Sequence, residues 1–311
     1  MDGIILMHWR LDFLDEPAWR RLLASAEHPA LQQSWGYGVA VAGQGHAVVR
    51  AVLHDGERCL ALAQVVRRRL PCGWGVGLLL RGPVWLEAPD AERETVAIDR
   101  LRAALGRTLL VWQPDDADAG ERRAGWRRVW TGPSTAWLDL TPPAALLRSR
   151  LDAKWRNRLV QAEATSMSAI EAVGGSDFEW LVEANERQRL RVGYRGPSAG
   201  FIRALAAAGR RGMMALIARH EGAPVAGVLL ARHGRAATYY AGVTTAAGRQ
   251  LRAHHRLLWE GILRLQRAGC TALDLGGIDT VTSPGIARFK LGLGATPLTL
   301  AGSYLVAPRL R

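Results

Sequence analysis

The chain has 311 residues, of which 49% are hydrophobic and 22% are charged. This balance is typical of a globular protein with one large domain or two ordinary ones. Its longest apolar runs are about ten residues, too short for a bilayer-spanning helix. The acidic N-terminal segment lacks the basic start of a signal peptide, and the three cysteines are widely spaced. We therefore expect a cytoplasmic protein with no metal site and no stable membrane insertion.

The chain is strongly basic, with 41 Lys and Arg residues against 28 Asp and Glu residues, a formal charge of +13. Only two of the basic residues, Lys154 and Lys290, are lysines. A GC-rich genome explains the preference for arginine, but it does not explain the excess of basic over acidic residues. The excess suggests a polyanionic partner such as RNA, a phosphorylated substrate or an anionic membrane surface.

The basic residues are unevenly distributed. Residues 187–211 hold seven arginines and no acidic residue, and further basic runs lie at 148–158 and 249–267. These runs fit either a basic groove or ordinary solvated helix faces.

Hydrophobic periodicity and turn residues predict alternating helices and strands in the first half. Helices are expected at 17–28 and 30–42, and valine-rich strands at 46–54 and 58–67 flank the hairpin turn Asp55-Gly56-Glu57. After these come a strand at 84–86, a helix at 89–105 and strands at 109–112, 126–130 and 135–140.

The same order of elements returns in the second half. The expected helices are 144–164, 177–190, 198–208 and 250–268, and the expected strands are 213–219, 225–231, 236–243 and 272–275. The repetition predicts an α/β fold of two related units packed side by side, with domains at 1–140 and 141–311.

Several short motifs then occur in a recognisable order. They are Tyr239-Tyr240-Ala241-Gly242, Leu257-Leu258-Trp259-Glu260-Gly261-Ile262, Leu273-Asp274-Leu275-Gly276-Gly277, Gly285-Ile286-Ala287-Arg288-Phe289-Lys290 and Gly292-Leu293-Gly294. Their order resembles the C-terminal signature of the FemAB/FemX family. In the first half, Gln33-Ser34-Trp35 and Arg81-Gly82-Pro83-Val84 resemble family motifs more weakly, as does the segment from Thr135 to Ala162.

The resemblance implies two tandem GNAT-like (N-acetyltransferase-like) domains and an aminoacyl-tRNA-dependent transfer. In this family an acceptor amine attacks an aminoacyl ester on tRNA, and a peptide bond forms. The best-known members act on a peptidoglycan precursor, and related enzymes load other small peptides or metabolites. An aminoacyl ester is already activated, so the reaction needs no cofactor and no metal.

The resemblance also implies residue roles. Lys290 matches the lysine of the family's F-K motif, which stabilises the oxyanion of the tetrahedral intermediate. The adjacent Phe289 either stacks on the terminal adenine of tRNA or is a core aromatic residue. Tyr240 resembles a tyrosine that contacts the acceptor, although a structural tyrosine fits equally. Lys290 itself could also be an ordinary surface lysine.

Further substrate-binding residues follow from the basic runs and the motifs. Lys154 and Arg156 are candidates for phosphate contacts, with a solvated helix face as the alternative. Arg189, Arg191 and Tyr194 fall where the family holds its acceptor's phosphates, and Trp35 belongs to the early motif. No cation follows Trp35 within six residues, although the family has one there. This departure puts a peptidoglycan-precursor acceptor in doubt more than the aminoacyl chemistry.

Two other functions remain open. An acyl-CoA-dependent N-acyltransferase shares the fold, but it needs a Gly-rich pyrophosphate loop at a helix start. The segment from Thr244 to Arg252 contains one glycine and two arginines with a different spacing. A non-catalytic module that binds RNA or a membrane surface is supported by charge alone.

Overall fold

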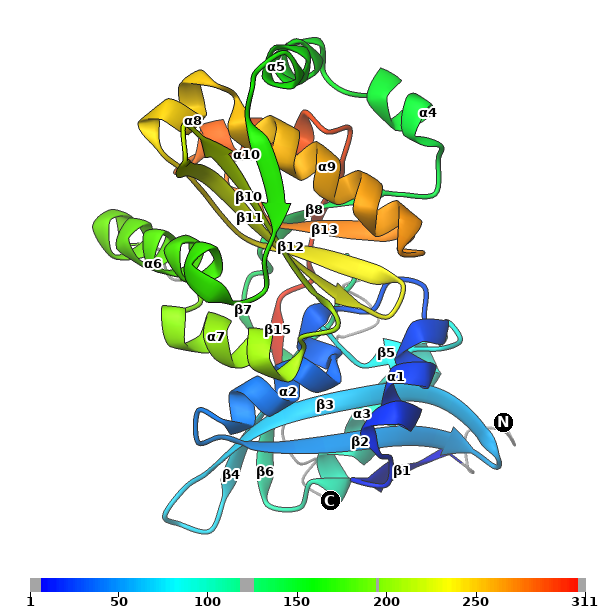
Figure 1. Ribbon diagram of the computed structural model, residues 1–311. Helices are drawn as coiled ribbons and strands as arrows, with labels where there is room; N and C mark the ends of the chain where they lie inside the picture. The colour runs from blue at the N-terminus through cyan, green and yellow to red at the C-terminus, as the bar shows by residue number, and fades with distance from the viewer. Residues whose placement is uncertain (1–6, 118–125, 194–195, 307–311) are drawn as a thin grey trace. The chain divides into compact units, whose positions relative to one another are not determined.

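The computed structural model describes residues 7–117, 126–193 and 196–306, which form two mixed α/β units (Figure 1). The first unit comprises residues 1–134 and 298–311, and the second comprises 135–297. Each unit has its own sheet. The α/β class expected from the sequence is confirmed.

The units differ from the expected ranges of 1–140 and 141–311 in two places. Strand β8, Ser134–Asp139, pairs with β13 in the sheet of the second unit. Strand β15, Ser303–Val306, returns to the first unit, where it pairs antiparallel with β6 and β7. The expected ranges missed this return because strand pairing between distant segments leaves no local sequence signal.

The first unit has a sheet with strand order β1-β2-β3-β4-β6-β15-β7, and β5 pairs with β3. Its strands are β1 Met7–Leu11, β2 Ala47–Asp55, β3 Arg58–Arg69, β4 Gly75–Leu80, β5 Val84–Trp85, β6 Thr108–Gln113, β7 Arg127–Trp130 and β15. Its helices are α1 Glu16–Ser25, the 3-10 turn η1 Leu31–Gln33, α2 Trp35–Ala42 and α3 Ala91–Ala104.

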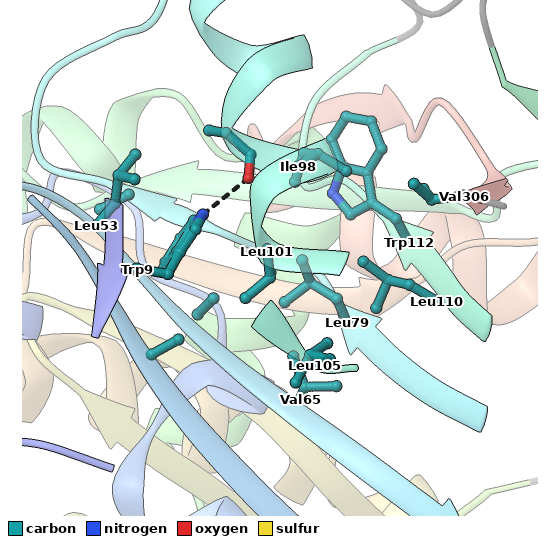
Figure 2. Packing of buried hydrophobic residues seen from close by; sticks show 14 of the residues in the cluster. Trp9, Leu53, Val65, Leu79, Ile98, Leu101, Leu105, Leu110, Trp112 and Val306 are labelled. Carbon is teal, nitrogen blue, oxygen red and sulfur yellow. Dashed lines mark hydrogen bonds between the residues drawn. The ribbon is translucent and has the colours of Figure 1, made fainter. Parts of the chain in front are cut away.

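Alternation along the strands gives this sheet two buried faces. Ala51 and Leu53 belong to the cluster that contains Ile98 of α3, whereas Val52 belongs to the cluster that contains Trp19 of α1. Figure 2 shows Leu53 and Ile98 in the first of these clusters. In the α3 cluster, the Trp9 indole N–H donates a 2.8 Å hydrogen bond to the Ala97 carbonyl oxygen. Helices α1 and α3 therefore cover opposite faces of the sheet.

The second unit has a sheet with strand order β14-β8-β13-β12-β11-β10-β9. Its strands are β8, β9 Ser168–Glu171, β10 Met213–His220, β11 Ala223–His233, β12 Ala236–Thr244, β13 Ala272–Gly277 and β14 Thr296–Thr299. Its helices are α4 Ala144–Ser149, α5 Ala153–Glu163, α6 Gly175–Val192, α7 Ala199–Ala208, α8 Ala246–Gln250, α9 Ala253–Arg267 and α10 Pro284–Leu291.

Helices α6 and α9 pack on opposite faces of this sheet. The backbone at Gly227 of β11 lies against Leu181 of α6, and Gly261 of α9 lies against Leu230 of β11. The motif glycine Gly261 thus allows a close helix–sheet approach, because a Cβ there would lie 2.6 Å from Leu230.

Three helices differ from the continuous helices predicted. The predicted helix 30–42 divides into η1 and α2, because the Ser34 side chain caps α2 by accepting from the backbone N–H of Tyr37. The predicted helix 144–164 divides into α4 and α5, because the Asp152 side chain caps α5 by accepting from the backbone N–H groups of Lys154 and Trp155. The predicted helix 250–268 instead begins at Ala253 after α8, since Arg252 adopts a left-handed backbone with φ of 56°. No helix within the described ranges is long and apolar enough to cross a membrane.

Candidate active site

Strands β12 and β13 separate partway along their length. They pair in parallel only where Ala236–Thr238 faces Ala272–Asp274, yet β12 continues to Thr244 and β13 to Gly277. Beyond the paired stretch, the facing backbone groups of the two strands do not pair with each other. Backbone groups that lose a strand partner need another hydrogen-bond partner, which a bound molecule can supply.

A β-bulge in β12 lies where the strands separate. Ala241 pairs with Leu229 of β11 and Tyr239 pairs with Leu230, so Tyr240 is the extra residue. A bulge bends and twists its strand, and it changes the direction of the side chain it carries. Tyr240, which the sequence suggested as a substrate-binding residue, is half-buried at this bulge.

Lys290 lies at the separated ends of these two strands. Its side chain comes from α10 and is 8% exposed. Its Nζ donates a 2.7 Å hydrogen bond to the carbonyl oxygen of Gly277, the last residue of β13. The same Nζ lies 5.8 Å from the ring centre of Tyr239 on β12. Lys290 is therefore a buried ammonium and not a surface lysine.

The Lys290 ammonium retains hydrogen-bonding capacity. An ammonium carries three N–H donors, and within the described part of the chain the Gly277 carbonyl is its one acceptor. Burial lowers the pKa of Lys290 to about 8, and the nearby Asp274 carboxylate opposes that shift. At neutral pH the side chain is mostly charged, with two donors available for a ligand.

Asp274 is a buried carboxylate near this lysine. It is 1% exposed and lies on β13 between the fully buried Leu273 and Leu275. Its Oδ1 accepts hydrogen bonds from Thr135 Oγ1 at 2.6 Å and from the backbone N–H of Gly276 at 2.8 Å. Neither Asp274 nor Thr135 was predicted as a site residue from the sequence. An acidic residue inside an otherwise apolar strand was the available signal.

A second polar pair lies beside Lys290. The Tyr239 hydroxyl and His254 Nε2 share a 2.8 Å hydrogen bond. Burial lowers the pKa of His254 to about 4 and raises the pKa of Tyr239, so both groups are neutral near pH 7. Gly242 is required here, because a Cβ on it would lie 1.9 Å from the Tyr239 hydroxyl oxygen.

Phe289 belongs to an aromatic cluster. Its ring centre lies 5.0 Å from that of His255 and 5.9 Å from that of Trp155. The Trp155 indole N–H donates to the Phe289 carbonyl oxygen at 3.1 Å. The half-buried Phe289 thus joins α10 to α5 and α9, and these contacts favour the core alternative over adenine stacking.

The other predicted residues of this unit lie on two helices. Lys154 is exposed at the start of α5, and Arg156 on the same helix donates to the Ser149 carbonyl oxygen at 3.2 Å. On α6, Arg189 makes a bidentate pair with Glu186, with N–O distances of 2.7 and 2.8 Å, whereas Arg191 is exposed. Tyr194 lies outside the described residues.

Trp35 belongs to the first unit and contacts a cation that the sequence did not suggest. The Arg50 guanidinium lies 3.5 Å from the centre of the Trp35 ring, and Arg50 Nε donates to Gln64 Oε1 at 3.0 Å. Burial lowers the pKa of Arg50, and Asp12 and Glu16 oppose that shift. Arg50 lies on β2, fifteen residues after Trp35, so it falls outside the six residues after Trp35 in which the sequence was searched for a cation.

Residues 148–291 match the family model described as an acetyltransferase (GNAT) domain, and this range includes Lys290. No curated protein has a significantly matching sequence.

Three solved structures share the fold over nearly the whole chain. FemX has a TM-score of 0.81 at 13% identity, covering 95% of this chain and 96% of its own. A tandem GNAT protein from the clavulanic acid biosynthesis pathway has a TM-score of 0.52 at 15% identity, covering 96% and 97%. The C-terminal domain of a putative lysylphosphatidylglycerol synthetase from Agrobacterium fabrum has a TM-score of 0.56 at 12% identity. The match covers 94% of this chain and 93% of that domain.

These findings define the class of the protein. It has a double GNAT-like fold of two tandem α/β domains, as expected from the sequence. Its fold is FemX-like, and the family match together with the shared fold supports an acyltransferase.

Proposed function

We propose that the protein is an aminoacyltransferase that moves an amino acid from aminoacyl-tRNA to the amine of a small peptide, peptidoglycan-precursor or metabolite acceptor. The observation that carries this proposal is the buried Lys290 at the separated ends of β12 and β13, with two unused N–H donors. The motif resemblance and the FemX-like fold support the same reaction class.

The geometry suits attack on an activated ester. When the acceptor amine adds to the ester carbonyl, negative charge develops on the carbonyl oxygen. A charged donor that is already fixed and partly desolvated stabilises that oxygen without reorganising during the reaction. Lys290 meets both conditions, since the Gly277 carbonyl fixes it and burial removes water from it. Proximity of the two substrates supplies most of the remaining acceleration.

The basic charge of the protein supports a polyanionic donor such as tRNA. The formal charge is +13, and Lys154 and Arg158 lie exposed one helical turn apart on α5. Helix α5 adjoins Lys290 through the hydrogen bond between Trp155 and Phe289. Cations on this helix therefore lie next to the segment that carries the proposed catalytic residue and can contact nucleic-acid phosphates.

An acyl-CoA-dependent N-acyltransferase is the second candidate, and the match to an acetyltransferase domain favours it. An acyl-CoA donor would place its pyrophosphate at the segment after β12, so the hydrogen bonds of that segment bear on this candidate. Thr245 caps α8 by accepting from Gly248 N–H, and Arg249 donates to the Thr244 carbonyl oxygen at 3.1 Å. The segment's own groups thus use part of its capacity to bind an anion.

The test offers the protein charged tRNA or acetyl-CoA together with a panel of amine acceptors and measures the mass of the acceptor. We expect a mass increase of one aminoacyl residue with charged tRNA only, and loss of that product in Lys290→Ala. Arg288→Ala, which removes an exposed cation from the same helix, is the matched control and retains the product. An acetyl increment with acetyl-CoA and none with charged tRNA would establish the second candidate instead.

A further inference from the structure

The carboxylate of Asp274 is buried near Lys290. A buried carboxylate needs hydrogen bonds or a counter-charge to offset its lost hydration. Asp274 receives two hydrogen bonds at Oδ1, from Thr135 and from the backbone of Gly276. Both are short, at 2.6 and 2.8 Å, so the carboxylate is held in one orientation.

The bond to Gly276 also shapes the segment that holds the lysine. Gly276 has φ of +71°, a conformation that glycine adopts readily and other residues rarely adopt. The next residue, Gly277, presents its carbonyl oxygen to Lys290 Nζ at 2.7 Å. Asp274 thus fixes the backbone at Gly276 and, with it, the Gly277 carbonyl oxygen that accepts the hydrogen bond of Lys290.

We propose that Asp274 is a positioning residue that keeps Lys290 oriented and charged in the opening between β12 and β13. It acts through two routes, the hydrogen bond to Gly276 and the negative charge beside the ammonium. The role of Lys290 in transfer rests on the proposed function, whereas the effect of Asp274 on Lys290 is a property of the structure alone.

Among the groups that face Lys290, Asp274 is the one that favours its protonated form. From β13 it is faced by the Asp274 carboxylate and the Gly277 carbonyl, and from β12 by the Tyr239 ring. His254 of α9 is bonded to the Tyr239 hydroxyl, and both are uncharged near neutral pH. On α10 itself, Arg288 is exposed. The direct electrostatic influence on Lys290 is that of Asp274, which opposes the desolvation of the ammonium.

The chain is suited to a direct measurement because it has only two lysines. Protein labelled with ¹³C and ¹⁵N in lysine gives two side-chain signals, and Lys154→Arg removes one of them and assigns both. Titration of the Lys290 signal is compared in the wild type, in Asp274→Asn and in Asp139→Asn. Asp139 is an exposed carboxylate on β8, so its variant is the matched control.

We expect Asp274→Asn to lower the Lys290 pKa by about one unit or more, the usual effect of removing a nearby opposite charge. Asp139→Asn leaves it unchanged. In transfer assays, the loss of rate at alkaline pH then moves to lower pH in Asp274→Asn, and turnover falls more than the apparent affinity for the donor. Asp274→Ser, which is also neutral, replaces the asparagine variant if that variant does not fold.

An identical Lys290 titration in wild type and in the neutral Asp274 variants overturns the inference. If the pKa shifts as expected but wild-type protein transfers no aminoacyl group, the proposed function fails and the link between Asp274 and Lys290 stands. A shifted pKa with an unchanged pH–rate profile overturns the positioning role in transfer.

Discussion

Lys290 Nζ is held at 2.7 Å by the carbonyl oxygen of Gly277, so the proposed catalytic group of α10 is fixed to the end of β13. The two residues are thirteen positions apart and belong to different elements. This contact makes the lysine rigid and partly dehydrated, which is the state that an oxyanion-stabilising group requires.

Replacing Lys290 tests whether its charge stabilises the oxyanion during transfer. We expect Lys290→Ala to reduce the single-turnover transfer rate by roughly 10²–10³, the typical loss of one oxyanion-stabilising donor. Lys290→Arg restores little, because a planar guanidinium does not fit a buried site built for a compact ammonium. Melting temperatures are recorded alongside. Wild-type rates in the arginine variant, or losses of activity that follow losses of melting temperature, would contradict a catalytic role.

Lys290 should also limit stability. Its folded pKa is about 8, below the ordinary 10.5, so the unfolded chain binds the proton more tightly. The charged lysine therefore destabilises the folded state below pH 8, on the order of 3 kcal/mol. This penalty disappears as the pH rises from about 8 to 10.5. Lys290→Met, which keeps a similar volume, should raise the free energy of unfolding at pH 7 and much less at pH 10.

The measurement is urea unfolding of wild type and Lys290→Met at both pH values, within the range where unfolding is reversible. Equal stabilisation at pH 7 and pH 10 would mean that packing, and not the buried charge, causes the difference.

Two adjacent histidines predict loss of stability in acid. Burial lowers the pKa of both His254 and His255 to about 4. Between pH 6.5 and 4 the unfolded chain takes up protons that the folded chain excludes, so stability falls as the pH falls through this window. His255→Phe removes one such group while keeping an aromatic ring against Trp155 and Phe289.

We expect the free energy of unfolding to decline less between pH 7 and pH 4.5 in His255→Phe than in wild type. Urea titrations at four pH values in that interval give the two curves. Parallel curves would show that His255 is not a source of the acid sensitivity.

Two cations of α5, the exposed Lys154 and the half-buried Arg156, should act on donor binding. Lys154→Ala and Arg156→Ala are expected to raise the apparent KM for charged tRNA and to change turnover less, as for contacts kept through the reaction. Each lost phosphate contact also makes the dependence of binding on salt concentration shallower. Binding isotherms at several salt concentrations test this, and unchanged KM and salt dependence in both variants would identify solvated surface charges.

The sequence by itself determined the local elements of the second unit. The strands at 213–219, 225–231 and 236–243 match β10, β11 and β12, because short Gly-containing turns and apolar runs are local signals. The order of the motifs also indicated the double GNAT-like fold and directed attention to Lys290. These features depend on residues that are neighbours in the chain.

Only the tertiary structure decided what surrounds Lys290. The eight-residue helix α10, which begins at Pro284 and carries Lys290, was not among the elements expected from the sequence. Its lysine is buried at the point where β12 and β13 separate, near Asp274, and no periodicity in the sequence encodes that meeting. Likewise, Arg50 reaches Trp35 and β15 joins β6 through contacts between distant segments. Strand register and burial are nonlocal properties, so the electrostatics of the site follow from packing and not from residue spacing.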